Sequence, residues 1–581
     1  HLTIVVFDSW GKFQSGLFER NVVNVGSFTE CIEFRHRTEP NNGIIQGQYC
    51  LVGFKALNSS YHKNSSSVFD WREIGDFVGK QNLSIITGFC LPASCSEKKV
   101  VQFLNEFLPT TNLNATKAQC QTNDPKPTTS LDVFAKSFFN FYGVILIAST
   151  IYDVLKRKRN QDPNALLAAF SIYTNGKQLF NTSEDNMKSL SGIRFFSLLW
   201  IIFGHRVFFQ MQFPISNFPQ LIRESDMSVT IFTSFNLAVD TFFVMGALLA
   251  TMSCLSAFDC QKFSARRMIL HRYIRYTPCV TALLLYVLSI WKFQFEGPFS
   301  NDDSIVACQN YWWSTLLHIQ NYVNGHQLCL GISWYLSADF QLYLLPPAII
   351  YPAWRWGWKH LWIPVLLAIF CCAYIFGMFF VTRDPGLDFI AVYLPTHARM
   401  GPWMVGIILG FIIHRYRGKN LKFGRWTNII GWFAALLTIT AILIAGVIPI
   451  NSKVVDASLL AFRRLAWAIA LAWIIFACQI LKTGGIIRWL LSLRQWQPIA
   501  RMSLSIFLYH TLYQATLLFN SKDVVTLEEP FIRQNVNGDI LGSFMGGVVL
   551  YLSFERPFQL IEKYFYNLRN NKKVDANATS E

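Results

Sequence analysis

Charged side chains are scarce in this sequence. Asp, Glu, Lys and Arg make up only 15% of its 581 residues, whereas 52% are hydrophobic and 15% are aromatic. Soluble globular domains carry about 25% charged residues, so this composition, with a mean hydropathy of +0.29, excludes an ordinary soluble protein. It predicts a chain that crosses a membrane several times.

Acidic residues are fewer than basic ones, 35 against 51, and the formal net charge is +16. A basic chain can bind nucleic acid, but here Lys and Arg fall in short loops between apolar runs, as the positive-inside rule requires. No basic soluble module interleaved with aromatic residues is present. We therefore expect no nucleic-acid partner and assign the positive charge to the cytosolic face of a membrane.

Three common catalytic signatures are missing as well. The sequence has no Gly-x-Ser-x-Gly nucleophile elbow, no glycine-rich phosphate loop, and no His, Cys and carboxylate group at metal-ligand spacing. We therefore expect no metal site and no resident cofactor.

Cysteines and glycosylation sequons gather in residues 1–125, which are more polar than the rest. This combination indicates an oxidising lumen or the cell exterior and predicts a small disulfide-rich domain. Five cysteines is an odd number, and the chain opens on HLTIVVF with neither an initiator Met nor a signal peptide. We expect a processed or trimmed N-terminus whose missing piece held a sixth cysteine. The cysteines are Cys31, Cys50, Cys90, Cys95 and Cys120, and the sequons begin at Asn58, Asn64, Asn82 and Asn114.

Eleven membrane spans, within a range of 10–12, follow this region. The first ends at the basic segment KRKR (156–159), which places its exit in the cytosol and the cysteine-rich region on the other side. Alternation then puts the C-terminus in the cytosol. The spans lie near 138–152, from Ser191 onward, and near 229–252, 277–293, 333–353, 361–382, 400–413, 427–449, 460–481, 503–520 and 539–555.

The predicted fold is therefore an all-α polytopic membrane domain preceded by a small disulfide-rich luminal or extracellular domain. Residues 126–190 form the first transmembrane helix and a basic cytosolic linker, 191–560 the main transmembrane domain, and 561–581 a cytosolic tail. The loop after the fourth span holds Cys308 and Cys329, both on the luminal side, so we expect a disulfide between them.

The second span, SGIRFFSLLWIIFGHR, contains two ionisable residues, Arg194 and His205. Such residues cost at least about 2.5 kcal/mol inside a bilayer and usually have a task or a partner. Eleven residues turn a helix through roughly 1,100°, so both side chains share one face, about 16 Å apart along the axis. A guanidinium at the cytosolic mouth suits a phosphate ligand, and a deeper histidine suits general-base catalysis.

This second span carries an arginine followed, after ten residues, by a histidine. That pattern on the first helix of a polytopic domain resembles the acyltransferase-3 family. Four further segments continue the resemblance in order along the chain: AVDTFFVMG, HRYIRYTP, SWYLSADFQLY and SLSIFLYH. The N-terminal segments FDSWGKFQSGLFERNVVNVGSFTEC, QGQYCLVGF and TGFCLPASCS, with CQNYWWSTLLHIQNY before Cys329, resemble the nose-resistant-to-fluoxetine group. That group joins a cysteine-rich domain to an acyltransferase-3 domain, and the resemblance covers nearly the whole chain.

The resemblance implies transfer of an acyl group from cytosolic acyl-CoA, the expected donor, to a hydroxyl on the luminal side. His205 is then the base that activates the hydroxyl, and Arg194 holds the donor or its developing charge. Asp240 and Asp339 are candidate catalytic partners that orient or charge-balance His205, although an ion pair that stabilises helix packing explains them as well.

Six further positions are candidate substrate-binding residues. The two arginines of the HRYIRYTP segment suit the phosphates of CoA, but a positive-inside flank also explains them. A histidine in the late span either joins the site or is a buried core residue, and an arginine near a luminal helix end either lines the acceptor side or snorkels. The six residues are Arg272, Arg275, Trp334, Arg399, Ser503 and His510.

Two departures from the family pattern leave other functions open. Gly246 stands where the family often has serine, and Asp339 stands where glutamate is commoner. A transporter of lipids or small hydrophobic drugs on the same scaffold is the main alternative, and a receptor-like role of the cysteine-rich domain is another. In each case we expect a multi-pass protein of the endoplasmic reticulum or plasma membrane, in contact with membrane lipids. The acceptor can be a lipid, sterol, glycan or small molecule.

Overall fold

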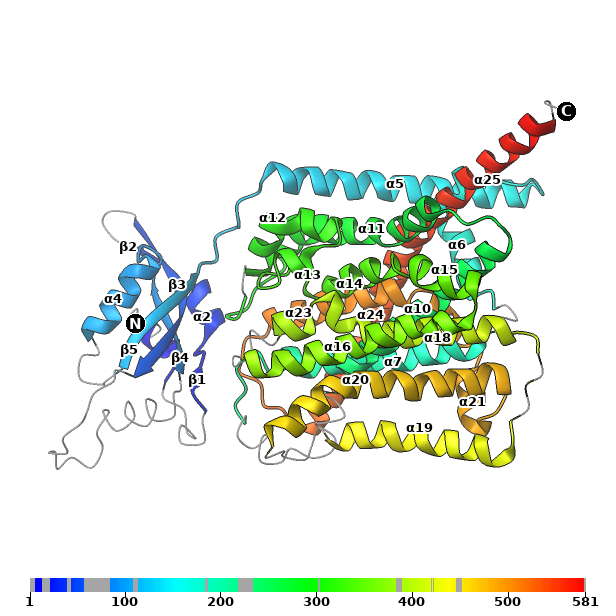
Figure 1. Cartoon of the computed structure of the whole chain (residues 1–581). Helices are drawn as coiled ribbons and strands as arrows, with labels where there is room; N and C mark the ends of the chain where they lie inside the picture. Colours follow the sequence, from blue (N-terminus) through cyan, green and yellow to red (C-terminus); the bar gives the residue numbers. More distant parts are fainter. Residues whose placement is uncertain are drawn as a thin grey trace.

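The computed structural model shows a small sheet domain at one end of a long bundle of helices (Figure 1). It describes residues 6–12, 21–38, 43–56, 84–107, 113–182, 187–217, 234–300, 303–382, 389–419, 421, 423–445 and 452–578. The chain passes from the sheet domain into α5 (Ser130–Lys158), which lies along one side of the bundle.

The N-terminal domain is built around one long strand. That strand, β3, pairs antiparallel with β2, β4 and β5, and β4 also pairs in parallel with β1. Alternate residues of β3 face α4 and bury Val52 and Phe54 against Leu104. The elements are β1 (Val23–Asn24), α2 (Phe28–Glu33), β2 (Arg35–Thr38), β3 (Gly43–Ala56), β4 (Ser84–Pro92), α4 (Glu97–Phe107) and β5 (Leu113–Gln121).

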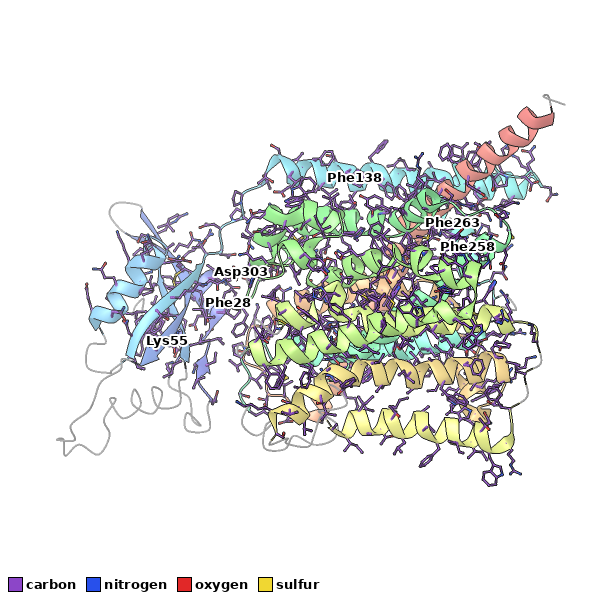
Figure 2. The ribbon with its side chains drawn as sticks, in the orientation of Figure 1. Phe28, Lys55, Phe138, Phe258, Phe263 and Asp303 are labelled. Carbon is purple, nitrogen blue, oxygen red and sulfur yellow. A yellow bond between two sulfur atoms is a disulfide. The ribbon has the colours of Figure 1, made fainter. Side chains whose placement is uncertain are left out.

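Two disulfides hold this domain together. Cys31 on α2 is bonded to Cys90 on β4, and Cys50 is bonded to Cys120 on the adjacent strand. The ring of Phe28, labelled in Figure 2, packs edge-on against Tyr49 beside the first bond, with ring centroids 4.9 Å apart. Cys95 is free and half-buried, so it is the odd cysteine of the sequence.

The expected glycosylation sequons fall mostly outside the described residues. Asn58, Asn64 and Asn82 lie there, whereas Asn114 lies on β5 opposite Lys55 and is half-buried.

Among the described residues, nine helices are long and apolar enough to cross a membrane. They coincide with nine of the eleven expected spans. They are α5, α7 (Lys188–Gln210), α10 (Asn236–Asp259), α11 (Ala265–Ser289), α16 (Trp362–Val381), α18 (Met400–Tyr416), α19 (Arg425–Ala445), α20 (Lys453–Phe476) and α24 (Glu529–Leu550), which continues into α25 (Arg556–Ala578).

The other two expected spans are shorter helices. The segment expected at 333–353 is divided into α14 (Trp334–Tyr343) and α15 (Pro346–Trp356), because Pro346 begins a new helix and cannot continue the old one. The segment expected at 503–520 is α23 (Ser503–Phe519), with only 17 residues. Both pack inside the bundle, and α23 contacts α7 and α24. The expected bounds at 503–520 therefore agree with α23 within one residue, whereas the single span expected at 333–353 was wrong.

Between α24 and α25 the helix contains a π-helical segment, η9 (Tyr551–Glu555). Such segments interrupt an α-helix without ending it and are frequent at functional sites.

The sheet domain and the bundle meet at the end opposite the 156–159 basic segment (Figure 1). Gln119 donates a hydrogen bond to the carbonyl of Ser300 at 2.8 Å, and Asp132 at the start of α5 accepts an ion pair from Lys292 at 2.8 Å. The expected disulfide between Cys308 and Cys329 is present at this same end and joins α12 (Asp303–Leu316) to the loop after the short helix α13 (Gln320–Val323). The N-terminal domain itself contacts the bundle through Gln119 and through Gln121, which donates to the carbonyl of Pro298 at 3.3 Å.

Candidate active site

Two histidines from distant parts of the chain meet inside the bundle. His205 lies on α7 and His510 on α23, and His510 is completely buried. His510 Nε2 lies 3.0 Å from His205 Nδ1, and His510 Nδ1 lies 2.6 Å from the carbonyl oxygen of Phe507. The two rings are therefore held by direct hydrogen bonds, although 305 residues separate them in the sequence.

The contacts of this pair determine which nitrogens carry protons. A carbonyl oxygen only accepts hydrogen bonds, so His510 Nδ1 must donate to Phe507. A neutral imidazole has one donor and one acceptor nitrogen, which makes His510 Nε2 the acceptor and His205 Nδ1 the donor. The lone pair of His205 that can take up a proton is then on Nε2.

The helix that carries His205 is fixed by close packing and by an ion pair. A Cβ atom at Gly204 would lie 2.0 Å from the ring of Phe235, so only glycine permits α7 to approach this closely. On the other side, Arg206 forms a two-point ion pair with buried Asp539 of α24, and Gln514 of α23 donates to the same carboxylate at 3.0 Å. Three helices are thus joined one residue away from His205.

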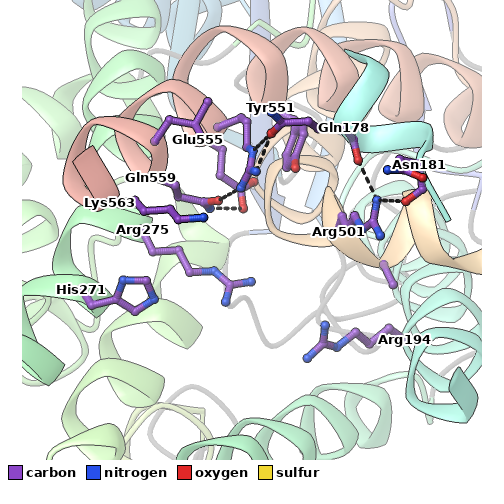
Figure 3. Close-up of a pocket in the computed structure, with 13 residues that line it drawn as sticks. Gln178, Asn181, Arg194, His271, Arg275, Arg501, Tyr551, Glu555, Gln559 and Lys563 are labelled. Atoms are coloured by element: carbon purple, nitrogen blue, oxygen red, sulfur yellow. Dashed lines mark hydrogen bonds between the residues drawn. The ribbon is translucent and has the colours of Figure 1, made fainter. Parts of the chain in front are cut away.

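Arg194 lies three turns earlier on α7, in the wall of a basic cavity of about 590 Å³. Figure 3 shows Arg194 and Arg275 of α11 extending into this cavity from opposite sides. Among the described residues neither guanidinium has an acidic partner within ion-pair distance, and Arg275 Nε is buried without a hydrogen-bond partner. The cavity is also lined by His271, Arg501, Glu555, Arg556 and Lys563.

The excess of positive charge in this cavity is large. Its one acidic side chain, Glu555, accepts a hydrogen bond from Ser505 at 2.6 Å and one from Gln559 at 3.3 Å. Arg501 is used to bind the end of α6 (Ile172–Phe180), donating to the carbonyls of Gln178 and Asn181 at 2.7 Å each. Arg556 donates to the side-chain oxygen of Gln178 at 2.6 Å. Among the described residues of the cavity, Arg194 and Arg275 are therefore the two guanidiniums that are available to a ligand with several negative charges.

A second cavity, of about 210 Å³, continues from the first into the bundle. Both are lined by Arg194, His271 and Arg275, which shows that the two spaces adjoin. The inner one extends to Ile201 on α7 and Phe507 on α23, one helical turn before His205 and one before His510. The expected site residue Ser503 also lines it, and its hydroxyl donates to the carbonyl of Ala500 at 3.0 Å.

The two expected carboxylate partners of His205 are elsewhere. Asp339 binds Arg272 and accepts a hydrogen bond from Tyr276 at 2.5 Å, whereas Asp240 pairs with Arg399 at 3.1 Å. The expectation that they orient His205 was wrong, because His510 occupies that place. Both act instead as buried ion pairs between helices, the alternative that the sequence left open.

These pairs also change the expectation for three substrate-binding candidates. Arg272 lines the inner cavity but is held by Asp339 rather than exposed to the basic cavity. Arg399 is fully buried between Asp240 and the ring of Trp334, which lies 5.0 Å from its guanidinium. Trp334 is not among the residues that line the inner cavity, whereas the next residue, Tyr335, is.

Several site residues were missed in the sequence. Arg206 interrupts an apolar run and Asp539 begins one, and that signal is present in both segments. Glu555, Arg556 and Lys563 lie at the end of the last span, where they resembled an ordinary basic flank.

Comparison with known proteins gives two matching families. Residues 2–104 match the family described as "Nose resistant-to-fluoxetine protein, N-terminal domain", and residues 187–551 match the family described as "Acyltransferase domain" of the acyltransferase-3 type. The helix α5 lies between the two matched segments.

Two relatives come from Caenorhabditis elegans. The chain is similar to Nose resistant to fluoxetine protein 6, with 24% identity over 100% of this chain and 80% of the relative. It is also similar to Regulator of hypoxia-inducible factor 1, with 22% identity over 43% of this chain and 56% of that protein. No solved structure matches. Because the acyltransferase match covers more than half of this chain, the chain belongs to the acyltransferase-3 family, and it carries a nose-resistant-to-fluoxetine N-terminal domain.

Proposed function

We propose that this protein transfers an acyl group from cytosolic acyl-CoA to an acceptor hydroxyl on the luminal side of a membrane of the secretory pathway. The observation that carries the proposal is the pair of adjoining cavities, which lead from Arg194 and Arg275 towards the His205–His510 pair. Phosphate groups of CoA fit the basic cavity because neither guanidinium has an acidic partner within ion-pair distance among the described residues.

The spacing along α7 fits the shape of this donor. Arg194 and His205 are about 16 Å apart along the helix axis, and the extended pantetheine arm of CoA places its sulfur at a comparable distance from its phosphates. With phosphates at Arg194, the thioester reaches the depth of His205. The acceptor then meets the thioester from the opposite side of the bundle.

In the proposed reaction, His205 Nε2 takes the proton of the acceptor hydroxyl as the oxygen attacks the thioester carbonyl carbon. The C–S bond of the tetrahedral intermediate then breaks, and the CoA thiolate takes the proton from Nε2, leaving an ester and free CoA. His510 Nε2 accepts the hydrogen bond of His205 Nδ1 throughout and stabilises the imidazolium that forms.

The orientation of the protein in the membrane is part of the proposal. The disulfides of the N-terminal domain and the bond between Cys308 and Cys329 lie at the end of the bundle that we assign to the lumen. Glycosidase treatment of the full-length, cell-expressed protein should increase its electrophoretic mobility, and removal of the Asn114 sequon should reduce that shift. Unchanged mobility after treatment would argue against the orientation.

The activity is tested with purified protein and labelled acyl-CoA, by measuring CoA release in the presence of candidate lipid, sterol, glycan and small-molecule acceptors. His205→Ala should lower transfer by about 10²–10⁴-fold while CoA binding is retained, since general-base catalysis contributes that much. His414→Ala is a matched control, because His414 pairs with Asp259 at 2.8 Å outside both cavities. Equal activity of His205→Ala and the parent would contradict the catalytic assignment.

A transporter of lipids or small hydrophobic molecules is the second candidate. The observation that favours it is Gly246, which lines the inner cavity where the family often has serine. A Cβ atom there would lie 3.2 Å from Asp339 Oδ1, and that oxygen is buried without a hydrogen-bond partner. Uptake of a labelled lipid by proteoliposomes without CoA release would support transport over transfer.

A further inference from the structure

A long groove lies on the side of the bundle, separated from both cavities of the candidate active site by α11 and α25. It has a volume of about 1500 Å³ and runs between α5, α11 and α25. None of its lining residues lines the two cavities described above. Figure 2 shows Phe138 on α5 and Phe263 before α11, which line different parts of its length.

The length of the groove matches a bilayer. On α11 its lining residues extend from Arg266 to Leu285, which is about 28 Å at 1.5 Å per residue. The hydrocarbon core of a bilayer is about 30 Å thick, so the acyl chains of one leaflet occupy roughly 15 Å of this depth. The groove therefore accommodates the chains of a membrane lipid along its axis.

Aromatic rings form one wall of the middle of the groove. The rings of Phe138 and Tyr142 stack with centroids 5.8 Å apart, and Tyr142 stacks on Phe554 at 4.6 Å. The hydroxyl of Tyr142 donates to the carbonyl of Ser553 at 2.5 Å, so this ring offers its apolar surface rather than a polar group. Such a wall suits saturated or unsaturated hydrocarbon.

One end of the groove is cationic. Lys262, Arg266 and Arg267 gather there, at the start of α11. The nearby carboxylate of Glu562 is bound by His271 at 2.6 Å, and the guanidinium of Arg267 lies 3.3 Å from the ring centroid of Tyr566. Asp132 and Lys292 join the opposite ends of α5 and α11, so the two helices are antiparallel and this cationic end lies on the membrane face of the 156–159 basic segment.

The groove depends on a helix outside both matched families. The family matches cover residues 2–104 and 187–551, and α5 spans Ser130–Lys158. Without α5 the groove would keep only α11 and the α25 side as walls.

From these observations we propose that the groove is a binding site for one phospholipid with an anionic headgroup, drawn from the leaflet that the 156–159 segment faces. The phosphate and headgroup lie against Lys262, Arg266 and Arg267, and the acyl chains lie along α5 and α11. The site is separate from the acyl-transfer site and does not require that activity.

The experiment uses the full-length protein, equilibrated with mixed phosphatidylcholine–phosphatidylserine vesicles, extracted in mild detergent and analysed by native mass spectrometry. The parent should retain phosphatidylserine in preference to phosphatidylcholine. The double variant Lys262→Ala/Arg266→Ala should lower this preference by roughly 25-fold, because each basic residue near an anionic lipid contributes about fivefold. Lys158→Ala/Arg159→Ala removes the same charge on the same face outside the groove and should leave the preference unchanged.

A second variant tests the apolar part independently of charge. Thr281 is exposed and lines the groove, so Thr281→Trp places a large ring among the acyl chains and should reduce retention of both lipids. The proposal is overturned if the parent shows no headgroup preference or if Thr281→Trp retains as much lipid as the parent. It is also overturned if the native mass spectrum shows a lipid-free dimer in which a second copy of the chain covers the groove, or if added acyl-CoA displaces the retained lipid.

Discussion

Replacement of His510 by leucine tests the histidine pair more sharply than replacement of the base itself. His510 contacts no substrate in the proposed mechanism, and its role is to accept the hydrogen bond of His205 Nδ1 at 3.0 Å. Leucine fills a similar volume but offers no acceptor, so the imidazolium formed at His205 loses one charged hydrogen bond.

The size of the effect follows from that contact. A hydrogen bond to a charged group contributes about 1.5–3 kcal/mol, and about 1.36 kcal/mol corresponds to a tenfold change in rate. His510→Leu should therefore lower kcat by about 10- to 150-fold. The KM for acyl-CoA should change little, because the basic cavity that includes Arg194 and Arg275 is a helical turn or more away.

The assay measures CoA release at saturating acceptor, together with thermal stability of the same preparations. His510→Gln is the matched control, since its side-chain oxygen can accept the bond from His205 Nδ1 and should restore most of the rate. If leucine and glutamine variants are equally active, or both lose activity only in proportion to lost folded protein, the reasoning about the proton positions is refuted.

Three further outcomes follow from the same structure. Arg275→Glu should weaken CoA binding with little loss of folding, and equal CoA affinity in a folded Arg275→Glu protein would leave only a flanking role for this arginine. Arg272→Gln should instead lower the stability of the protein by about 3–5 kcal/mol, because it leaves the buried carboxylate of Asp339 without its ion-pair partner. Arg206→Leu should destabilise the protein by a similar amount, because it leaves Asp539 buried without its ion-pair partner. The double variant Arg206→Leu/Asp539→Leu should regain part of the lost stability in thermal unfolding, and a double variant as unstable as the single one would contradict the pairing. Cys308→Ser should cost about 3 kcal/mol of stability, since the lost bond closes a loop of 21 residues, and free thiols at both positions in non-reduced native protein would rule the bond out.

The sequence predicts which residues gather at this site better than it predicts which of them contact one another. Periodicity along α7 places Arg194 and His205 on one face, and motif order brings His510 into the same domain. Which side chain neighbours His205 depends on how α7, α10 and α23 pack laterally, and no spacing along one helix contains that information. Asp240 and Asp339 were therefore assigned to the wrong partner, although their burial and charge were foreseen.

The shorter helices have a similar explanation. A run of apolar residues shows that a segment is buried, but a helix enclosed by other helices does not need the full length that lipid contact demands. α23 has 17 residues and packs inside the bundle, so hydropathy predicted its place and its length within one residue but not which helices enclose it. The odd cysteine, Cys95, could not be identified either, because pairing depends on which strands lie side by side.

The π-helical segment Tyr551–Glu555 has a consequence for how this protein tolerates insertions and deletions. A π turn holds one residue more than an α turn, so everything that follows it is rotated by about 100° relative to an uninterrupted α-helix. Gln559 and Lys563 line the basic cavity only with that rotation in place. Conversion of this segment into ordinary α turns, with no residue removed, would turn both side chains away from the cavity while leaving every chemical group of the chain's basic surface intact. Removal of one residue together with that conversion would keep both side chains at the cavity. We therefore expect the helix to tolerate the loss of one residue within Tyr551–Glu555 better than the loss of one residue in the α-helical turns on either side.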